Sequence, residues 1–419
     1  NINMNFSNTV GLSDDLMEQG VIANPHKYYK NLRETEPVHW NDRWGGWILT
    51  AYDDCVQVLR DSKNFSSDRM AYLAKELSYK ERENISPIFD VLSRWMVFMD
   101  PPKHTSLRML LNPLFTPKEV ERYRMMVRNI VETTLDDIIE KGNIEFVRDF
   151  AYKVPMTAIL QLLGTPDMDT ESIKQWSEKI GLFFFIKADE PNRREIACEG
   201  INSMVEYLKP IIAQRRKSPK DDLISILIKA QEAGKLEAED VLATCVLLVF
   251  GGHETTMNLI ANGTLALINH SQEWTRLQED HSLIESAVEE LLRYDGSVKA
   301  TVRWAKENVQ LGDKTLKKGE RVLVCLSGAN RDALQFSNPD ELDLSRDPNL
   351  HVALAHGIHI CLGASLARLE AQEAFLGLTS RLKCPTVDTE NLKYHPSLVH
   401  RALKELSLTV NQNEKHIAV

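Results

Sequence analysis

The chain has 419 residues, of which 43% are hydrophobic and 26% are charged, a composition typical of a globular protein with an extensive core. Its formal net charge of −10 argues against a general nucleic-acid-binding protein, which needs a basic face. The six cysteines are scattered, so neither a disulfide framework nor a zinc site is expected. No segment resembles a membrane span or a signal peptide, and we expect a cytoplasmic protein that contacts neither membrane nor nucleic acid.

Hydrophobic periodicity predicts a mainly α chain with small β-sheets (α+β). Residues 38–40 and 47–50 are short aromatic and β-branched runs around a glycine pair, which predicts a β-hairpin. Apolar residues at helical spacing predict helices over residues 52–60, 118–141, 201–216, 222–234 and 238 to about 269.

The C-terminal half begins with a further helix signal. Ser282 and Glu285 have the spacing of a capping box, so we expect them to open the helix that carries Glu290 and Arg293. Apolar alternation near residues 309–326, interrupted by two glycine-containing turn signals, predicts a second small sheet.

Cys361 lies just before or at the start of another predicted helix, because leucines at 362, 366, 369 and 376 form one apolar stripe. A helix N-terminus carries partial positive charge and free N–H donors, which lower a thiol pKa and stabilise a thiolate. Gly357 and Gly363 flank the cysteine and let backbone amides approach the sulfur. The other five cysteines are interpreted as small apolar core residues, whereas this setting favours a thiolate at Cys361.

Four separated motifs, in order, resemble those of the cytochrome P-450 family. They are Gly251-Gly252-His253-Glu254-Thr255-Thr256, which is similar to the oxygen-binding I-helix motif; Glu290-Leu291-Leu292-Arg293, which resembles the Glu-x-x-Arg of the K-helix; Asn338-Pro339-Asp340-Glu341-Leu342-Asp343 leading to Arg346, which resembles the meander; and His356-Gly357-Ile358-His359-Ile360-Cys361-Leu362-Gly363, which resembles the haem-binding loop. A Glu-x-x-Arg alone has little specificity, but four motifs in order are specific.

The resemblance implies one cytochrome P-450 domain over residues 1–419, with a β-rich N-terminal part at about 30–60 and a helical core with the haem site at about 90–380. Haem b (iron protoporphyrin IX) would lie between the I-helix and the Cys loop with its L-helix. Cys361 would be the axial thiolate and metal ligand.

The resemblance also nominates His104, Arg108, Arg303 and His359 for the haem propionates, because buried anions need paired donors. Gly363 would contribute to the same haem-binding loop. The loop departs from the family pattern at Leu354 and Ala355, where phenylalanine and glycine are usual. This departure leaves ligation intact and changes the packing beside the sulfur.

The I-helix motif carries the expected catalytic residues. Gly251 and Gly252 each cost about 1 kcal/mol inside a helix, and we interpret them as giving space and a local kink where oxygen binds. Thr255 and Glu254 would deliver protons, because oxygen activation needs an acid and a hydroxyl group near the iron. The alternative is that Thr255 only hydrogen-bonds to its own helix.

Two further groups of charged residues are expected to act outside the reaction. Glu290, Arg293 and Arg346 would form a structural ion-pair triad, because one carboxylate can be shared by two guanidinium groups. Lys103 and Arg368, on the face nearest Cys361, would steer an acidic electron donor.

The substrate pocket is expected to be largely apolar. Residues 183–186 (Phe-Phe-Phe-Ile) are either a lid over this pocket or part of the core. Lys299 either faces the surface or holds a substrate carboxylate. Alignment with the family pattern gives Val97, Leu247, Phe250, Val298, Lys299 and Val399 as substrate contacts.

The function implied is a soluble bacterial-type monooxygenase that hydroxylates or epoxidises a hydrophobic small molecule, in the manner of enzymes that tailor polyketides and other natural products. O2 would be the co-substrate, and NAD(P)H would supply electrons indirectly through a ferredoxin or flavodoxin and its reductase. Alternatives are a fatty-acid, terpenoid or steroid hydroxylase, a peroxide-driven peroxygenase, and a haem sensor without turnover. The Glu254-Thr255 pair argues against the peroxygenase and the sensor, which need no proton relay.

Overall fold

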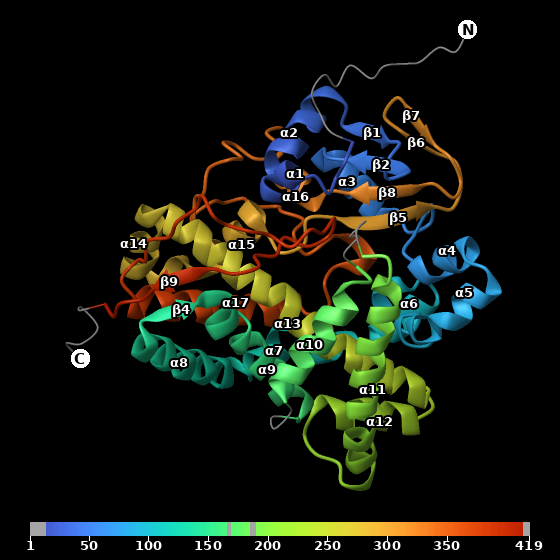
Figure 1. Cartoon of the computed structure of the whole chain (residues 1–419), viewed down its shortest axis with the longest axis horizontal. Coiled ribbons are helices and arrows are strands. Elements are labelled where there is room, and N and C mark those ends of the chain that lie inside the picture. The colour runs from blue at the N-terminus through green and yellow to red at the C-terminus, as the bar shows by residue number, and fades with distance from the viewer. Residues whose placement is uncertain (1–13, 166–168, 185–189, 414–419) are drawn as a thin grey trace.

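The structure is a computed structural model that describes residues 14–165, 169–184 and 190–413. A five-stranded sheet lies at one end of the molecule and helices build most of the rest (Figure 1). The sheet combines strands from distant parts of the chain in the order β1-β2-β8-β5-β3. These strands are β1 (Val38–Asn41), β2 (Gly46–Leu49), β3 (Phe65–Ser66), β5 (Thr301–Ala305) and β8 (Arg321–Val324).

The predicted hairpin is confirmed, because β1 and β2 pair antiparallel with Trp40 opposite Trp47. The second predicted sheet is partly wrong. β6 (Val309–Leu311) and β7 (Lys314–Leu316) form a separate two-stranded sheet, whereas β8 joins the main sheet parallel to β2. Three of the four residues of β8 are buried. The larger sheet provides this burial, because β8 lies between β2 and β5. A third small sheet pairs β4 (Asn143–Glu145) with β9 (Ser407–Thr409).

The helices account for most of the described chain. Their bounds are α1 (Gln19–Ala23), α2 (Pro25–Thr35), α3 (Tyr52–Arg60), α4 (Arg69–Glu76), α5 (Tyr79–Asn84), α6 (Lys103–Leu111), α7 (Pro117–Glu121), α8 (Arg124–Lys141), α9 (Lys153–Leu163), α10 (Thr170–Gly181), α11 (Arg193–Lys217), α12 (Leu223–Glu232), α13 (Ala238–Asn269), α14 (Ser271–Glu279), α15 (Ile284–Asp295), α16 (Leu326–Ala329) and α17 (Ala364–Arg381).

The predictions for α3 and α13 are confirmed, and α12 is shorter than predicted by a residue or two at each end. The single helix predicted over 118–141 is wrong. It divides into α7 and α8, and the turn between them is bridged by an ion pair of 2.6 Å between Arg124 and Glu121. The predicted helix over 201–216 begins earlier, at Arg193.

The predicted capping box at Ser282 is also wrong. The Asp280 carboxylate accepts the backbone N–H of Ser282, and a 3₁₀ turn over His281–Leu283 precedes α15. The side chain of Ser282 itself donates to Asp280 at 2.6 Å. An aspartate two residues upstream therefore provides the N-terminal acceptor that the sequence pattern assigned to the serine.

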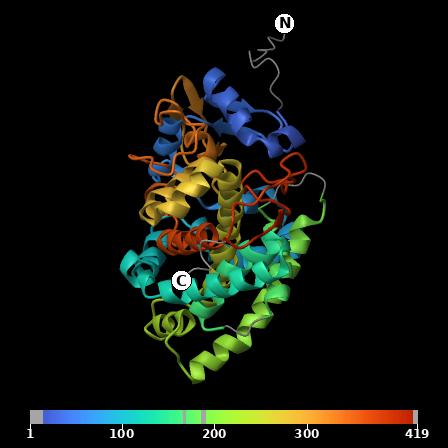
Figure 2. The same cartoon turned by 90° about the vertical axis from the view of Figure 1, so that its left-hand side faces the viewer.

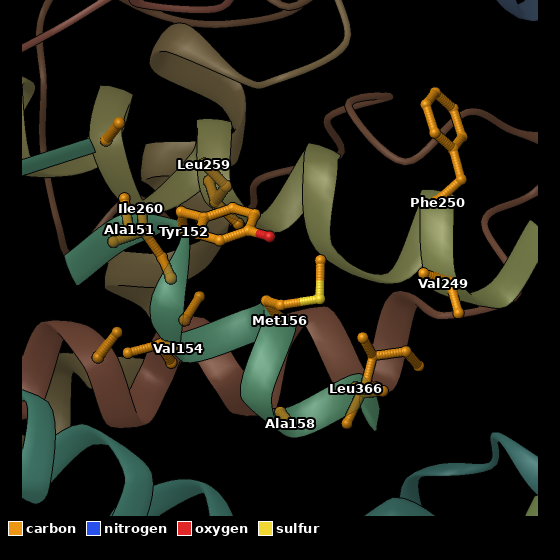
Figure 3. Packing of buried hydrophobic residues seen from close by; sticks show 14 of the residues in the cluster. Ala151, Tyr152, Val154, Met156, Ala158, Val249, Phe250, Leu259, Ile260 and Leu366 are labelled. Atoms are coloured by element: carbon orange, nitrogen blue, oxygen red, sulfur yellow. The ribbon is translucent and has the colours of Figure 1, made fainter. Parts of the chain in front are cut away.

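α13 runs through the centre of the molecule, with the α9 segment on one side and α17 close to both (Figures 1 and 2). Figure 3 shows Tyr152, Val154 and Met156 packed toward Leu259 of α13, with Leu366 of α17 below. Gly263 allows α13 and α17 to pack closely, because a Cβ at this position would lie 2.4 Å from the ring of Phe375 on α17. Among the described helices, none combines the length and apolar character that a membrane span requires.

Candidate active site

A cavity of about 290 Å³ lies between α13 and the loop that precedes α17. Gly251, Gly252 and Thr255 line it from α13, and Cys361 lines it from the loop. Most of the other lining side chains are aliphatic, from several helices and from the segment before β5. A largely apolar cavity with a few polar groups suits a hydrophobic ligand.

Cys361 projects into this cavity from a tight turn. Its backbone N–H donates to the Leu354 carbonyl at 2.9 Å, and α17 begins three residues later at Ala364. It is exposed to the cavity, whereas four other cysteines are buried and Cys384 is partly buried. This agrees with the interpretation of the other cysteines as packing residues.

The pKa of Cys361 is raised, whereas the sequence analysis expected it to be lowered. Burial raises its pKa, although the Gly363 backbone N–H, Arg108 and Arg368 act in the opposite direction. A metal bound at the sulfur would remove the proton outright.

The four residues nominated for haem propionates form one cationic cluster. The rings of His104 and His359 are 4.1 Å apart, and Arg108 donates to the Ile360 carbonyl at 2.7 Å. Burial, with Arg303, His104 and Arg108 nearby, lowers the pKa of His359 to about 3. Nε2 of His104 and Nε2 of His359 are buried without a hydrogen-bond partner in the described part of the chain. Two arginines and two neutral histidines with vacant ring nitrogens fit a pair of buried carboxylates.

The two glycines of α13 have different surroundings. A Cβ on Gly251 would meet only the Leu247 side chain, at 3.8 Å, whereas a Cβ on Gly252 would lie 2.8 Å from Ile159 of α9. Gly252 is therefore required by helix packing, in addition to any role beside the cavity. α13 stays α-helical through both positions.

Thr255 lines the cavity, and its hydroxyl donates to the Gly251 carbonyl at 3.2 Å. The intrahelical hydrogen bond considered as an alternative is thus present, and it leaves the side chain at the cavity wall.

Glu254 is not part of that wall. Burial, followed by the nearby Glu178 carboxylate, raises the pKa of Glu254 to about 7. Nε2 of His253 is 3.8 Å from Glu254, but burial lowers the pKa of His253 to about 4 and keeps it neutral.

Only half of the proposed substrate contacts line the cavity. Val97, Leu247 and Val298 do so. Phe250 instead stacks on Trp95 at 5.7 Å between ring centroids.

Lys299 and Val399 were expected to contact the substrate, but neither lines the cavity. Val399 packs in a separate core cluster, and its carbonyl accepts the Lys299 backbone N–H at 2.6 Å. Lys299 is 3% exposed, so it lies neither at the surface nor on the cavity wall. Burial and the nearby Arg401 lower its pKa to about 7. Val298 and Lys299 are neighbours in an extended segment, and alternate side chains of such a segment point in opposite directions.

The structure describes the first two residues of the aromatic run at 183–186. Phe183 and Phe184 are buried, and Phe184 stacks on Trp95 and Phe250 at 6.1 and 5.4 Å. Phe185 and Ile186 lie outside the described residues. The described pair is core packing, as one of the two interpretations expected.

The expected ion-pair triad is confirmed. Arg293 donates to both carboxylate oxygens of Glu290 at 2.8 Å, and Arg346 donates to the same carboxylate at 3.1 Å. Glu290 and Arg293 are fully buried. Glu290 and Arg293 belong to α15, and none of the three residues lines the cavity, so the triad is structural.

The cytochrome P450 family model matches residues 47–400. The chain belongs to the cytochrome P450 family. The biotin biosynthesis cytochrome P450 of Bacillus subtilis (strain 168) is 34% identical over 393 residues, which cover 93% of this chain and 96% of that protein. The polyketide biosynthesis cytochrome P450 PksS of the same organism is 33% identical, with coverage of 93% and 96%. The crystal structure of P450BioI with an acyl carrier protein ligated to hexadec-9Z-enoic acid matches with a TM-score of 0.85 at 32% identity, covering 94% of this chain and 99% of that one.

This cytochrome P450 is therefore a monooxygenase that uses haem b and O2, with electrons from redox partners. The residues described above fit haem: Cys361 offers the thiolate donor, and the cationic cluster offers unused donors for two propionates. Bound haem supplies the iron at which O2 is activated, and a thiolate ligand favours cleavage of the O–O bond.

Many cavity residues were missed by the sequence analysis, and three of them are polar residues outside the four motifs. Ser297 and Thr301 are polar side chains in the otherwise apolar wall, and no pattern distinguishes them from ordinary loop and strand residues. Glu370 of α17 also lines the cavity, and neither of its carboxylate oxygens has a partner among the described residues. Burial raises its pKa well above the usual range. The sequence did contain a signal, because Leu362, Leu366 and Glu370 follow at intervals of four on an apolar helix face.

Proposed function

We propose that this cytochrome P450 inserts one atom of O2 into a C–H or C=C bond of a hydrophobic metabolite in a biosynthetic pathway. The observation that carries the proposal is an apolar cavity that has Cys361 on one wall and Gly251, Gly252 and Thr255 on the other. The names of the relatives, which refer to biotin and polyketide biosynthesis, support small-molecule tailoring. Fatty-acid, terpenoid and steroid substrates are the alternatives within the same class.

In this proposal each site residue has a distinct task. Cys361 donates its thiolate to the iron. His104, Arg108, Arg303 and His359 hold the propionates, and Gly363 directs its backbone N–H to the sulfur. Gly251 leaves open space beside the iron, because a side chain there would project into the cavity. The aliphatic wall that includes Val97, Leu247 and Val298 excludes water and orients the substrate.

Protons would reach the site through Glu254 and Thr255. A carboxyl group whose pKa is near 7 both gains and loses protons readily at neutral pH, and burial gives Glu254 such a value. Glu254 lies close enough to Glu178 of α10 for the two carboxylates to interact, and Glu178 is exposed. Glu178 and Glu254 thus form a route from solvent, and the Thr255 hydroxyl is its last group at the cavity.

Electrons would come from a ferredoxin or flavodoxin and its reductase, and the protein would work in the cytoplasm. The test is turnover with a surrogate redox pair, NADPH and isotopically labelled O2, after a screen for ligands that shift the haem spectrum. One labelled oxygen atom in the product supports the proposal. Product formed only with added peroxide indicates a peroxygenase, and ligand binding without any turnover indicates a sensor.

Two variants test the assigned residues in the same assay. Cys361→Ser should abolish the red-shifted Soret band of the reduced CO complex that thiolate ligation gives, whereas Cys384→Ser should retain it. Thr255→Ala should keep substrate binding but consume NADPH with release of hydrogen peroxide, and Thr255→Ser should restore coupling. A Cys361→Ser protein that keeps the band would show that another residue ligates the iron.

A further inference from the structure

Asp100 is a carboxylate beside the cationic cluster that is assigned to the haem propionates. It precedes α6, and its backbone carbonyl accepts the N–H of His104 at 3.0 Å. The backbone N–H of Ser67 donates to one of its carboxylate oxygens at 2.8 Å, and the Ser66 hydroxyl donates to the other. Both oxygens of Asp100 are thus held by β3 and by the residue that follows this strand.

The main sheet brings Asp100 close to Arg303. β3 pairs antiparallel with β5, and Ser66 lies opposite Trp304, so that continuing the register by one residue sets Ser67 beside Arg303. Burial lowers the pKa of Arg303 to about 10, and the nearby Asp100 carboxylate opposes this shift. The structure therefore places a negative charge next to a cluster that would bind two anions.

Arg303 keeps one edge of its guanidinium group available for a ligand. The side chain is buried, and its Nη1 donates to the Thr301 hydroxyl at 3.0 Å and to the Val302 carbonyl at 2.9 Å. Within the described residues, its Nε and Nη2 donate to no acceptor, and Asp100 makes no hydrogen bond to them. Nε and Nη2 together form an edge that can bind both oxygens of one carboxylate. Asp100 thus acts on the charge of Arg303 without occupying this edge.

The charge balance of the occupied site depends on Asp100. Arg108 and Arg303 carry two positive charges, whereas burial, followed by Arg108, lowers the pKa of His104 and keeps this ring neutral at pH 7. Two propionates would balance the two arginines, so the Asp100 carboxylate leaves one negative charge in excess. Asp100 is partly buried, and water and salt screen such a charge less than one at the surface.

We propose that Asp100 sets the charge of the propionate-binding cluster and thereby lowers the reduction potential of the bound haem. Reduction adds an electron to the site, and a fixed negative charge nearby makes that addition less favourable. The hydrogen bonds from Ser66 and Ser67 hold the carboxylate in place. A haem of lower potential accepts electrons only from a more strongly reducing donor. This inference rests on the propionate assignment in the proposed function and adds a residue that controls electron transfer.

Spectroelectrochemical titration of the holoenzyme tests the proposal. Asp100→Asn removes the charge, and the amide can keep both hydrogen bonds, because its oxygen accepts from Ser67 and its NH2 group donates to the Ser66 hydroxyl. At a fixed applied potential the ratio of ferrous to ferric haem should rise roughly three- to tenfold, the size expected for one partly buried charge at an effective dielectric constant of about 20. Asp100→Glu keeps the charge and should stay near the wild-type ratio. The Soret band of the reduced CO complex should be the same in all three proteins.

Asp90→Asn is the matched control, because Asp90 is an exposed carboxylate in the segment before Asp100. Its effect on the ratio should be small and should vanish at high ionic strength, whereas the effect of Asp100→Asn should persist. An unmoved ratio in Asp100→Asn, or an equal rise in Asp100→Glu, would overturn the proposal. Asp100→Ser is a second neutral variant. Loss of haem from both neutral variants would also overturn it, because Asp100 would then be required for the site to form.

Arg303→Gln separates this inference from the propionate assignment. It should lower the ratio of ferrous to ferric haem, which is the opposite sign to Asp100→Asn, and should speed the transfer of haem to apomyoglobin. An unchanged transfer rate together with the expected rise in Asp100→Asn would refute the assignment of Arg303 to a propionate alone. Faster transfer together with an unmoved ratio in Asp100→Asn would refute the role of Asp100 alone. Neither measurement depends on turnover, so both are independent of the monooxygenase assay.

Discussion

At the scale of single residues, Ala355 is the most unusual position of the haem-binding loop. Its φ is 63°, a left-handed conformation that costs an L-amino acid about 1 kcal/mol or more. The family motif usually has glycine there, which adopts this conformation without strain. The loop therefore keeps the geometry of the family, and the Cys361 N–H still reaches the Leu354 carbonyl, at an energetic cost to this protein.

Replacing Ala355 by glycine should remove that cost. We expect Ala355→Gly to raise the free energy of unfolding by about 0.5–1 kcal/mol, because the relief of strain exceeds the extra freedom of glycine in the unfolded chain. Ala353→Gly, two residues earlier and without a positive φ, should lower it. Urea unfolding of the holoenzyme measures both. A loss of stability in Ala355→Gly would show that the methyl group packs favourably.

Glu370 gives a pH-dependent prediction. Its folded-state pKa is raised by burial, so the folded protein holds this proton more tightly than the unfolded chain does. Stability is then lost as pH rises above the unfolded pKa of about 4.3, by about 1.4 kcal/mol per pH unit until the folded pKa is reached. Glu370→Gln cannot titrate, and it should match the wild type near pH 4 and exceed it in stability at pH 7.

Glu373, three residues later, is the control of opposite sign. Its pKa is lowered, because the hydrogen bonds from Arg128 and Arg124 outweigh burial. Glu373→Gln should therefore reduce stability at pH 7 and approach the wild type as the pH falls below about 4. If both variants have the same pH dependence, Glu370 is not protonated in the folded protein.

At the scale of elements, α13 combines two requirements in adjacent glycines. Gly251 faces the cavity, and Gly252 faces α9. The helix tolerates both because other residues on its core side, such as Leu259 and Ile260, are buried beside Ala151 and Tyr152, just before α9 (Figure 3). Packing of the long helix thus compensates for two residues of low helix propensity.

The two positions should respond differently to one methyl group. Gly252→Ala places a Cβ 2.8 Å from Ile159 and should lower the free energy of unfolding by about 1–3 kcal/mol. Gly251→Ala places it 3.8 Å from Leu247 and should raise stability by up to about 1 kcal/mol through helix propensity, while it reduces the space in the cavity. Thermal unfolding compares the two, and equal effects would contradict the packing role of Gly252.

At the scale of the whole molecule, the face near Cys361 is the expected docking site of the electron donor. α6 lies against the Cys loop, because His104 contacts His359 and Arg108 binds the Ile360 carbonyl. Lys103 at the start of α6 is exposed. Arg368 is a poorer candidate than expected, because it is held by Glu289 at 2.6 Å and is only partly exposed.

Lys103→Glu should raise the concentration of ferredoxin or flavodoxin needed for half-maximal turnover by about two- to fivefold at low salt, as expected for one exposed ion pair. The effect should vanish at high ionic strength, because exposed charges are screened. Lys217→Glu at the far end of α11 is the control, and it should have no effect. A salt-independent change at Lys103 would indicate a structural role instead of docking.

The sequence by itself determined the family, the helical fold class and the residues in its four motifs. Cys361, Gly251 and Thr255 could be placed at one cavity because each belongs to a short motif with a fixed relation to its own helix or loop. The triad of Glu290, Arg293 and Arg346 followed for the same reason. These inferences rest on the resemblance of four motifs, in order along the chain, to those of one family.

Only the tertiary structure decided which side chains reach the cavity and which charges lack partners. Val298 and Lys299 are adjacent, yet one lines the cavity and the other is buried elsewhere, since the direction of a side chain depends on what packs against its strand. The protonation of Glu370 depends on burial by distant segments. Residues of α4, β8 and α11 line one small cavity, and such a convergence leaves no pattern in any single stretch of sequence.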